Sequence, residues 1–262
     1  MATEPHGLTG SVDSHVSALV AGTNGLAYRH LIGRLAEYPI PHLRLPEADG
    51  DLLLDVGCSW GRWSVAAARL GYVPVGIDPA FESVQAAKRV ASQLGLKAMF
   101  VVGDARALPF RADTIDVAYS YSVLQHFSTA DVEIALAEIE RVLKPGGRSL
   151  IQMATAFGIR CLYHQVRRGF RAAVNFEVRY RRIARLKEMF TRRVGPSRLS
   201  VDCFFGLGIQ ESDTRMMPAW LRVVFRASGF LQRASLPLPW LMYAADSVYV
   251  ESTKPHPNPA KL

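Results

Sequence analysis

The residues that decide the fold are 55–62, with the sequence DVGCSWGR. They begin at the end of a short apolar run, residues 51–56, that is typical of a buried strand, and they precede a helical pattern over residues 63–70. Glycines in such a turn let a ligand come close to the backbone, because they carry no Cβ. Gly57 and Gly61 are four residues apart, and position 59 is Ser, so the turn does not fit the G-x-G-x-x-G spacing of a dinucleotide site.

The alternation of strand and helix continues from this turn toward the end of the chain. We predict further strands over residues 72–77, 98–102, 115–120, 148–153, 230–236 and 247–251, and helices over 81–94, 131–143 and 216–227. Strands that alternate with helices form parallel βαβ units with right-handed crossovers. We therefore expect an α/β, doubly wound (Rossmann-like), mostly parallel sheet of seven strands.

The same pattern divides the chain into five parts. We expect an N-terminal helical extension over residues 1–49, a ligand-binding core over 50–153, a basic insertion over 154–213, the completion of the sheet over 214–253 and a tail over 254–262. The insertion follows the fifth strand, so it lies where it can act as a lid or recognise a second ligand.

Composition restricts the class of protein. Hydrophobic residues make up 49% of the chain and charged residues 21%, as in soluble globular proteins. Residues 1–15 lack the basic and apolar regions of a secretory signal, and no apolar run is long enough to span a membrane. Three cysteines without CxxC spacing argue against a disulfide framework and a structural zinc site. We expect a cytoplasmic protein with reduced thiols and no metal.

Four later motifs follow the turn at regular intervals. They are VGID at residues 75–78, VGDA at 102–105, the strand and loop over 115–127, and LKPGG at 143–147. In this order they resemble the class I S-adenosylmethionine-dependent methyltransferases, and most nearly the branch that contains the ubiquinone and menaquinone methyltransferases. The resemblance implies S-adenosyl-L-methionine as the cofactor and a methyltransferase activity.

The resemblance also implies roles for individual residues. Asp78 would accept hydrogen bonds from the ribose hydroxyls, and Asp104 would meet the adenine amino group. The family usually has Gly where this chain has Ser59. The remaining cofactor contacts that we expect are Asp55, Gly57, Ser59, Gly61, Ala105 and Ser120. Asp116 begins its strand, away from the ligand edge, and we interpret it as structural.

Two further expectations follow from the family. In that family the N-terminal helices often cover the cofactor, and one of their residues binds the cofactor's carboxylate. Tyr28 and Arg29 are the candidates for this contact. The alternative is that Arg29 is solvated on a helix surface. His126 follows the fourth strand at the acceptor-facing edge. Because imidazole titrates near neutrality, we predict that His126 is the catalytic base, with a structural histidine as the alternative. Tyr121 and Gln125 would line the acceptor pocket.

Several subclasses of methyltransferase are excluded. Residues 120–122 read SYS, whereas base amino-methyltransferases carry an Asn/Asp-Pro-Pro-aromatic motif there. No cysteine stands where a cytosine C5 enzyme needs its nucleophile, and no paired acids suggest the metal site of catechol-type enzymes. The remaining alternatives are a small-molecule O-methyltransferase, an RNA or protein methyltransferase, and a non-catalytic domain that binds cofactor or a partner.

The net charge of +8 is concentrated in residues 157–198. This segment contains twelve basic and two acidic residues, a charge of +10, which leaves −2 for the rest. We predict that Arg181 and Arg182 recognise an anionic acceptor, such as a phosphorylated sugar, a lipid-linked glycan, a membrane surface or RNA. A solvated helix face is the alternative, and the absence of an RNA-binding module disfavours nucleic acid.

The acceptor expected from these residues is a small polar metabolite or glycan, methylated on oxygen. Aromatic residues between the arginines suit an amphipathic element that covers a pocket or touches a bilayer, so peripheral membrane contact stays open. The sequence does not specify the oligomeric state.

Overall fold

The computed structural model describes residues 12–13, 16–17, 19, 30–31, 34–206 and 208–257. More than half of the N-terminal helical extension expected over residues 1–49 lies outside these residues, and so do the candidate residues Tyr28 and Arg29. The family motifs and the basic segment lie within the described part.

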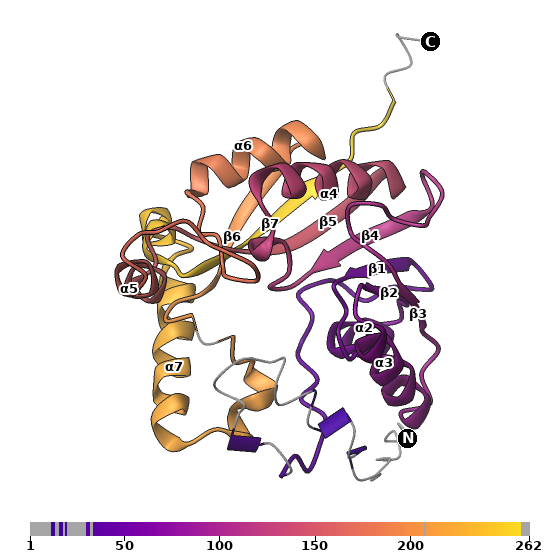
Figure 1. Ribbon diagram of the computed structural model, residues 1–262, viewed down its shortest axis with the longest axis horizontal. Coiled ribbons are helices and arrows are strands. Elements are labelled where there is room, and N and C mark those ends of the chain that lie inside the picture. The colour runs from indigo at the N-terminus through magenta and orange to yellow at the C-terminus, as the bar shows by residue number, and fades with distance from the viewer. Residues whose placement is uncertain are drawn as a thin grey trace.

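One sheet of seven strands forms the centre of the molecule, in the order β3-β2-β1-β4-β5-β7-β6 (Figure 1). The strands are β1 (Leu52–Val56), β2 (Val73–Asp78), β3 (Met99–Val102), β4 (Ile115–Ser120), β5 (Leu143–Ala154), β6 (Ser197–Cys203) and β7 (Ser247–Thr253). Strands β1 to β5 are parallel, and β7 runs antiparallel to both β5 and β6. The prediction of a doubly wound, mostly parallel, seven-stranded sheet is confirmed.

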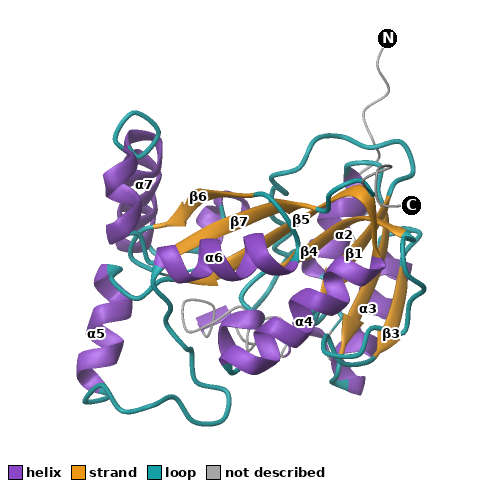
Figure 2. Ribbon diagram, turned by 90° about the horizontal axis from the view of Figure 1, so that it is seen from above, coloured by secondary structure: helices purple, strands orange, loops and turns teal. Residues whose placement is uncertain are grey.

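Helices cover both faces of this sheet (Figure 2). They are α2 (Arg62–Arg69), α3 (Phe81–Gln93), α4 (Thr129–Val142), α5 (Ile159–Arg167), α6 (Ile183–Arg193) and α7 (Ala219–Ala234), with 3-10 helices η2 (Leu124–His126), η3 (Glu211–Met216) and η4 (Pro239–Ala244). None of the described helices combines the length and the apolar character needed to cross a bilayer.

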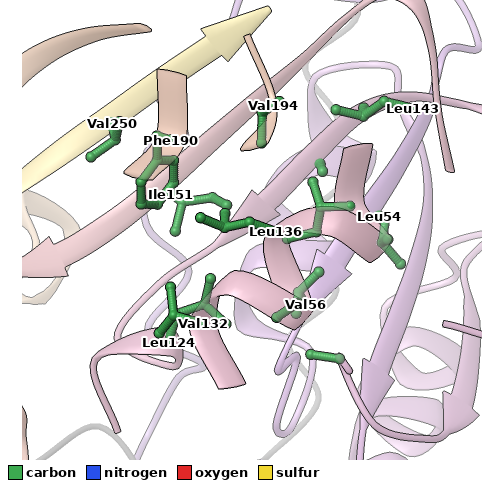
Figure 3. Packing of buried hydrophobic residues seen from close by; sticks show 14 of the residues in the cluster. Leu54, Val56, Leu124, Val132, Leu136, Leu143, Ile151, Phe190, Val194 and Val250 are labelled. Atoms are coloured by element: carbon green, nitrogen blue, oxygen red, sulfur yellow. The ribbon is translucent and has the colours of Figure 1, made fainter. Parts of the chain in front are cut away.

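The core has two layers because side chains alternate along each strand. Leu53 of β1 packs with Trp63 of α2 on one face. Leu54 and Val56 pack on the other face with residues of α4 and α6, among them Leu136 and Phe190 (Figure 3). Because both faces of the sheet are packed, the carboxyl ends of its parallel strands are held in place, and these ends are where a doubly wound fold binds ligands.

The strand predicted over residues 230–236 is wrong. Residues up to Ala234 continue α7, and the missing strand is β6, inside the segment expected to be an insertion. Helix α7 turns Ser228 inward, where its hydroxyl accepts a hydrogen bond from the Phe204 backbone N–H at 3.0 Å. Among the described residues β6 pairs only with β7, at the edge of the sheet, so its outer residues stay partly exposed and its apolar signal is weak.

The basic segment is not one continuous helical element. Helix α5 and helix α6 are separated by residues 168–182, and α6 packs beside α4 over the sheet. Glu133 of α4 forms ion pairs with three arginines of α6: Arg185 at 3.8 Å, Arg193 at 2.7 Å, and Arg192. A large part of the positive charge on α6 is therefore used to hold two helices together.

Candidate active site

A cleft of about 960 Å³ lies at the carboxyl ends of the parallel strands. One half is formed by the turn after β1 and by the ends of β2, β3 and β4. The other half is formed by α5, by residues 176–180 and by the start of β7. The volume is at the upper end of the range for small-molecule sites, roughly 300–1,000 Å³, and offers room for two ligands side by side.

The turn between β1 and α2 is closed against the end of β2. Gly57 has φ 76°, and a Cβ at this position would lie 2.3 Å from Cγ2 of Val123. The backbone N–H groups of Gly57 and Cys58 both donate to the Ile77 carbonyl. Only glycine combines this conformation with this contact, so the turn can form the floor of the cleft.

Ser59, which replaces the usual glycine of the family, lines the cleft in a left-handed conformation with φ 47°. Its N–H donates to Oδ2 of Asp78 at 3.0 Å. Its hydroxyl oxygen is buried and has no hydrogen-bond partner among the described residues. A buried hydroxyl without a partner is costly, so Ser59 is suited to bind a polar ligand group.

Asp78 lines the cleft at the end of β2. Its two carboxylate oxygens accept hydrogen bonds from the backbone N–H groups of Ser59 at 3.0 Å and Ala80 at 2.9 Å. These bonds fix the orientation of the carboxylate, and each oxygen keeps a second lone pair for a ligand hydroxyl.

Asp104, Ala105 and Arg106 line the same half of the cleft. Arg106 lies 2.6 Å from the Asp104 carboxylate, and its hydrogen bonds lower the pKa of Asp104. Arg106 also reaches Asp131 of α4 at 3.1 Å. The Asp104 carboxylate is therefore ionised and held at the mouth of the cleft.

Three of the expected cofactor contacts, Asp55, Gly61 and Ser120, do not line the cleft. Asp55 points from β1 toward α2, where the Ser64 hydroxyl donates to its Oδ2 at 2.7 Å. Burial raises the pKa of Asp55 to about 7. The Ser120 hydroxyl donates to the Val56 carbonyl at 2.9 Å.

Gly61 immediately precedes α2 with φ 84° and packs against α3, since a Cβ there would lie 3.1 Å from Cβ of Ala87. The absence of a side chain at Gly61 thus allows α2 and α3 to pack closely. Asp55, Gly61 and Ser120 thus support the strand ends and the turn from behind. Asp116, interpreted as structural, lies away from the cleft and pairs with Lys144 at 2.6 Å.

His126 lines the cleft at the end of η2. Its Nδ1 lies 2.8 Å from the Phe176 carbonyl, and its ring is parallel to the Phe176 ring at a centroid distance of 4.0 Å. A carbonyl only accepts, so Nδ1 carries the proton in the neutral ring. Burial lowers the pKa of His126 against the opposing effect of the Phe176 and Ser122 carbonyls.

Tyr121 and Gln125 also line the cleft, beside His126. The Tyr121 ring packs against Trp63 at 4.8 Å, and its hydroxyl donates to Oδ2 of Asp202 at 3.3 Å. Burial raises the pKa of Tyr121, so its hydroxyl stays protonated. The backbone carbonyl of Gln125 accepts from the Arg179 N–H at 2.8 Å, which joins the loop after β4 to residues 176–180.

Arg181 and Arg182, expected to bind an acceptor, lie outside the cleft. Arg181 is buried and donates to the carbonyls of Phe127 at 2.6 Å and Arg179 at 3.2 Å. Burial and the nearby Arg179 lower the pKa of Arg181 to about 10. Arg182 is exposed and lies over the Phe157 ring at 5.7 Å. Residues 179–181 pass beside η2, where the Arg179 N–H donates to the Gln125 carbonyl. The guanidinium of Arg181 is therefore engaged by backbone carbonyls.

Sequence reasoning missed several polar side chains of the second half of the cleft, among them Gln152, Arg160, Cys161, His164, Tyr180 and Asp246. Asp246 is 2% exposed, and its Oδ1 accepts from the Cys161 N–H at 2.9 Å. Its Oδ2 is buried without a partner among the described residues. Asp246 immediately precedes β7, which begins at the ligand edge because it is antiparallel, and this direction is not visible in the sequence.

The comparisons with known proteins match the part of the chain that contains the first half of the cleft. A family model described as "Methyltransferase domain" matches residues 53–147. The ubiquinone biosynthesis O-methyltransferase of Brucella anthropi is 34% identical over 99 residues, 38% of this chain and 39% of that protein. The curated relatives that head the comparison are thus covered over about two fifths of their length.

Solved structures show the same fold over a larger part of the chain. The YcgJ protein from Bacillus subtilis has a TM-score of 0.56 and 21% identity, over 80% of this chain and 94% of that chain. Magnesium protoporphyrin IX methyltransferase from Synechocystis PCC 6803 has a TM-score of 0.55 and 14% identity, over 80% and 76% of the two chains. Residues 53–147 are therefore similar to methyltransferase domains, and the chain shares its fold with solved structures that include a methyltransferase.

Proposed function

We propose that the protein transfers the methyl group of S-adenosylmethionine to a hydroxyl of a small acceptor held in the second half of the cleft. The observation that carries this proposal is the continuity of the cleft. A single cavity joins the turn at residues 57–60, Asp78 and Asp104 to His126, Gln152 and Asp246.

The residues of the first half fit this cofactor. The Ser59 hydroxyl lacks a partner among the described residues, and Asp78 is oriented by two backbone N–H groups. Ser59 and the turn would hold the methionine part, Asp78 the ribose, and Asp104 with Ala105 the adenine. Asp55, Gly61 and Ser120 would act indirectly, by keeping the turn and the strand ends in place.

The reaction is an in-line displacement, for which S-adenosylmethionine supplies an electrophilic methyl group when bound. The chain mainly has to align the acceptor and to remove its proton. In His126, Nδ1 is engaged with the Phe176 carbonyl, so Nε2 is the nitrogen that would accept the proton. The lowered pKa keeps the imidazole neutral, as a base requires.

Transfer to oxygen is supported by the name of the Brucella anthropi relative and by the polar groups of the second half. Gln152 is held by Ser122, whose N–H and hydroxyl donate to its Oε1 at 2.9 and 3.2 Å. Gln152, Tyr180 and Asp246 offer hydrogen bonds, and Phe176 offers an apolar wall. This lining suits a small metabolite or a sugar unit of a glycan better than a macromolecule.

The test has two stages. Calorimetry should show binding of S-adenosylmethionine and S-adenosylhomocysteine and none of NAD. Incubation with labelled S-adenosylmethionine should then transfer label to at least one member of a panel of phenols, sugars and sugar phosphates. NAD binding without sulfur-ligand binding would contradict the cofactor assignment, whereas label transfer only to RNA or protein would contradict the acceptor class.

A further inference from the structure

Exposed apolar side chains are unevenly distributed over the described residues. Of the nineteen large hydrophobic side chains that are exposed, fifteen lie in residues 157–176 and 220–243. The most exposed are Leu236 at 78%, Phe176 at 77% and Phe170 at 68%. Exposed apolar groups concentrated in this way are typical of an interaction site.

The same two stretches are free of acidic residues. Residues 157–176 contain four arginines and residues 220–243 contain three, with neither Asp nor Glu in either stretch. Arg168 and Arg171 pair with Glu177, just outside. The other five arginines make no ion pair with a described acid, namely Arg160, Arg167, Arg222, Arg226 and Arg233.

The two stretches adjoin in space. Gly158 immediately precedes helix α5, and a Cβ there would lie 2.4 Å from Cα of Asp246, two residues after the end of η4. The Cys161 N–H donates to Asp246 from the same turn of α5. Figures 1 and 2 both place α5 and α7 at one end of the molecule and α3 at the opposite end.

Helical spacing separates the exposed face of α5 from its cleft face. Ile159, Tyr163 and Val166 are each about 60% exposed and repeat at intervals of four and three residues, so they share one face. Cys161 and His164 of the same helix line the cleft. One helix thus separates the second half of the cleft from an apolar, basic outer surface.

We propose that the exposed residues of 157–176 and 220–243 form a docking surface for an anionic lipid bilayer. The surface combines aliphatic side chains, the aromatic residues Trp240 and Tyr243, and arginines without acidic neighbours. Trp and Tyr favour the interface between headgroups and acyl chains, and arginine extends its aliphatic stem over apolar surface while its guanidinium reaches phosphate.

Other occupants fit this surface less well. A symmetric contact between two copies would place arginines against arginines, with no acid on either side to compensate. Nucleic acid would pair with the arginines but would leave aliphatic residues such as Ile159 and Val166 without an apolar partner. An anionic bilayer satisfies both the charge and the apolar side chains.

The test is co-sedimentation of the full chain with vesicles of phosphatidylcholine alone and of phosphatidylcholine mixed with phosphatidylglycerol. We expect clear binding to the mixed vesicles, weak binding to the neutral ones, and partial loss in higher salt. Trp240→Ser and Val166→Ser should each weaken binding about tenfold. Arg226→Glu and Arg167→Glu should each weaken it about tenfold or more.

Matched control variants lie on the opposite side of the molecule. Met99→Ser changes an exposed apolar residue of β3, and Arg89→Glu reverses a charge on α3; both should bind vesicles like the wild type. The charge reversals keep the test valid if an apolar substitution impairs folding, and unchanged thermal midpoints identify the variants that fold. Calorimetry with S-adenosylhomocysteine should be unaffected, which separates this inference from the proposed activity.

Three results would overturn the docking surface. The first is equal binding, or none, to the two kinds of vesicle. The second is equal weakening by the control variants. The third is binding of another partner in place of vesicles. This partner would be a second copy, if the free protein sediments as a dimer that Trp240→Ser dissociates, or RNA, if RNA binds and vesicles do not.

Discussion

Gly57 shows how one hydrogen atom in place of a side chain shapes the cofactor half of the cleft. Gly57→Ala should lower the free energy of unfolding by about 2–4 kcal/mol, because a left-handed conformation strains alanine and the new Cβ would meet Val123 at 2.3 Å. Gly95→Ala is the matched control, since Gly95 has φ 65° with nothing within 4 Å of a Cβ. Urea unfolding of both variants separates strain from collision; equal losses would contradict the collision.

Asp55 gives the fold a dependence on pH. Burial raises the pKa of Asp55 to about 7 in the folded chain, above about 3.9 in the unfolded chain. The folded state therefore binds the proton more tightly, and the free energy of unfolding falls as pH rises between these values. Relative to Asp55→Asn, the wild type should lose on the order of 3 kcal/mol between about pH 5 and 8.

Urea unfolding of both proteins across this pH range measures the difference directly. Ser64→Ala removes the donor to the Asp55 carboxylate, so it should steepen the loss at the alkaline end. Parallel curves for the wild type and Asp55→Asn would show that the carboxylate does not titrate as inferred.

His126 is the residue on which the proposed chemistry depends. His126→Gln should lower kcat by about 10² to 10⁴, the usual contribution of a general base, and should leave the affinity for S-adenosylhomocysteine nearly unchanged. Because burial lowers the pKa of His126, kcat of the wild type should rise with pH through a value below 6.5. Measurements need an acceptor found in the labelled-methyl screen, and full activity of the variant would assign His126 a structural role.

At the scale of single residues, the sequence predicted those side chains whose position depends on the local motif. Asp78 is the last residue of β2 and lines the cleft, as do Ser59, Asp104 and His126. Asp246 could not be found in this way, because its position depends on the direction of a strand that pairs with distant residues. The buried guanidinium of Arg181 was misjudged for a related reason, since one of its carbonyl partners, Phe127, lies 54 residues away in the sequence.

At the scale of elements, the ion pairs between α4 and α6 explain why a basic helix lies on the sheet. Glu133→Gln should lower the thermal midpoint, because three arginines of α6 lose their shared carboxylate. Added salt should reduce the difference from the wild type, as it screens exposed charges. Glu188→Gln, which removes an acid that is 54% exposed, is the control and should have a smaller effect. Equal midpoints for the two variants would contradict this role.

Whole elements were predictable where periodicity was strong and ambiguous where it was weak. Strands β1, β2 and β4 are buried and apolar, so their positions followed from the sequence. Residues 230–236 contain apolar and polar residues in no clear period, so their sequence fits a strand as well as a helix. Packing of Ser228 against the backbone of Phe204 decides in favour of α7.

At the scale of the whole molecule, the order of strands has a consequence for the nascent chain. Strand β7 is the last of the seven strands along the chain, yet it lies between β5 and β6. Until the ribosome has released residues 247–253, β5 has one unpaired edge and β6 has no partner in the sheet. Unpaired edges of this kind invite aggregation, so we expect the sheet to be most exposed to misassembly in the interval before β7 is made.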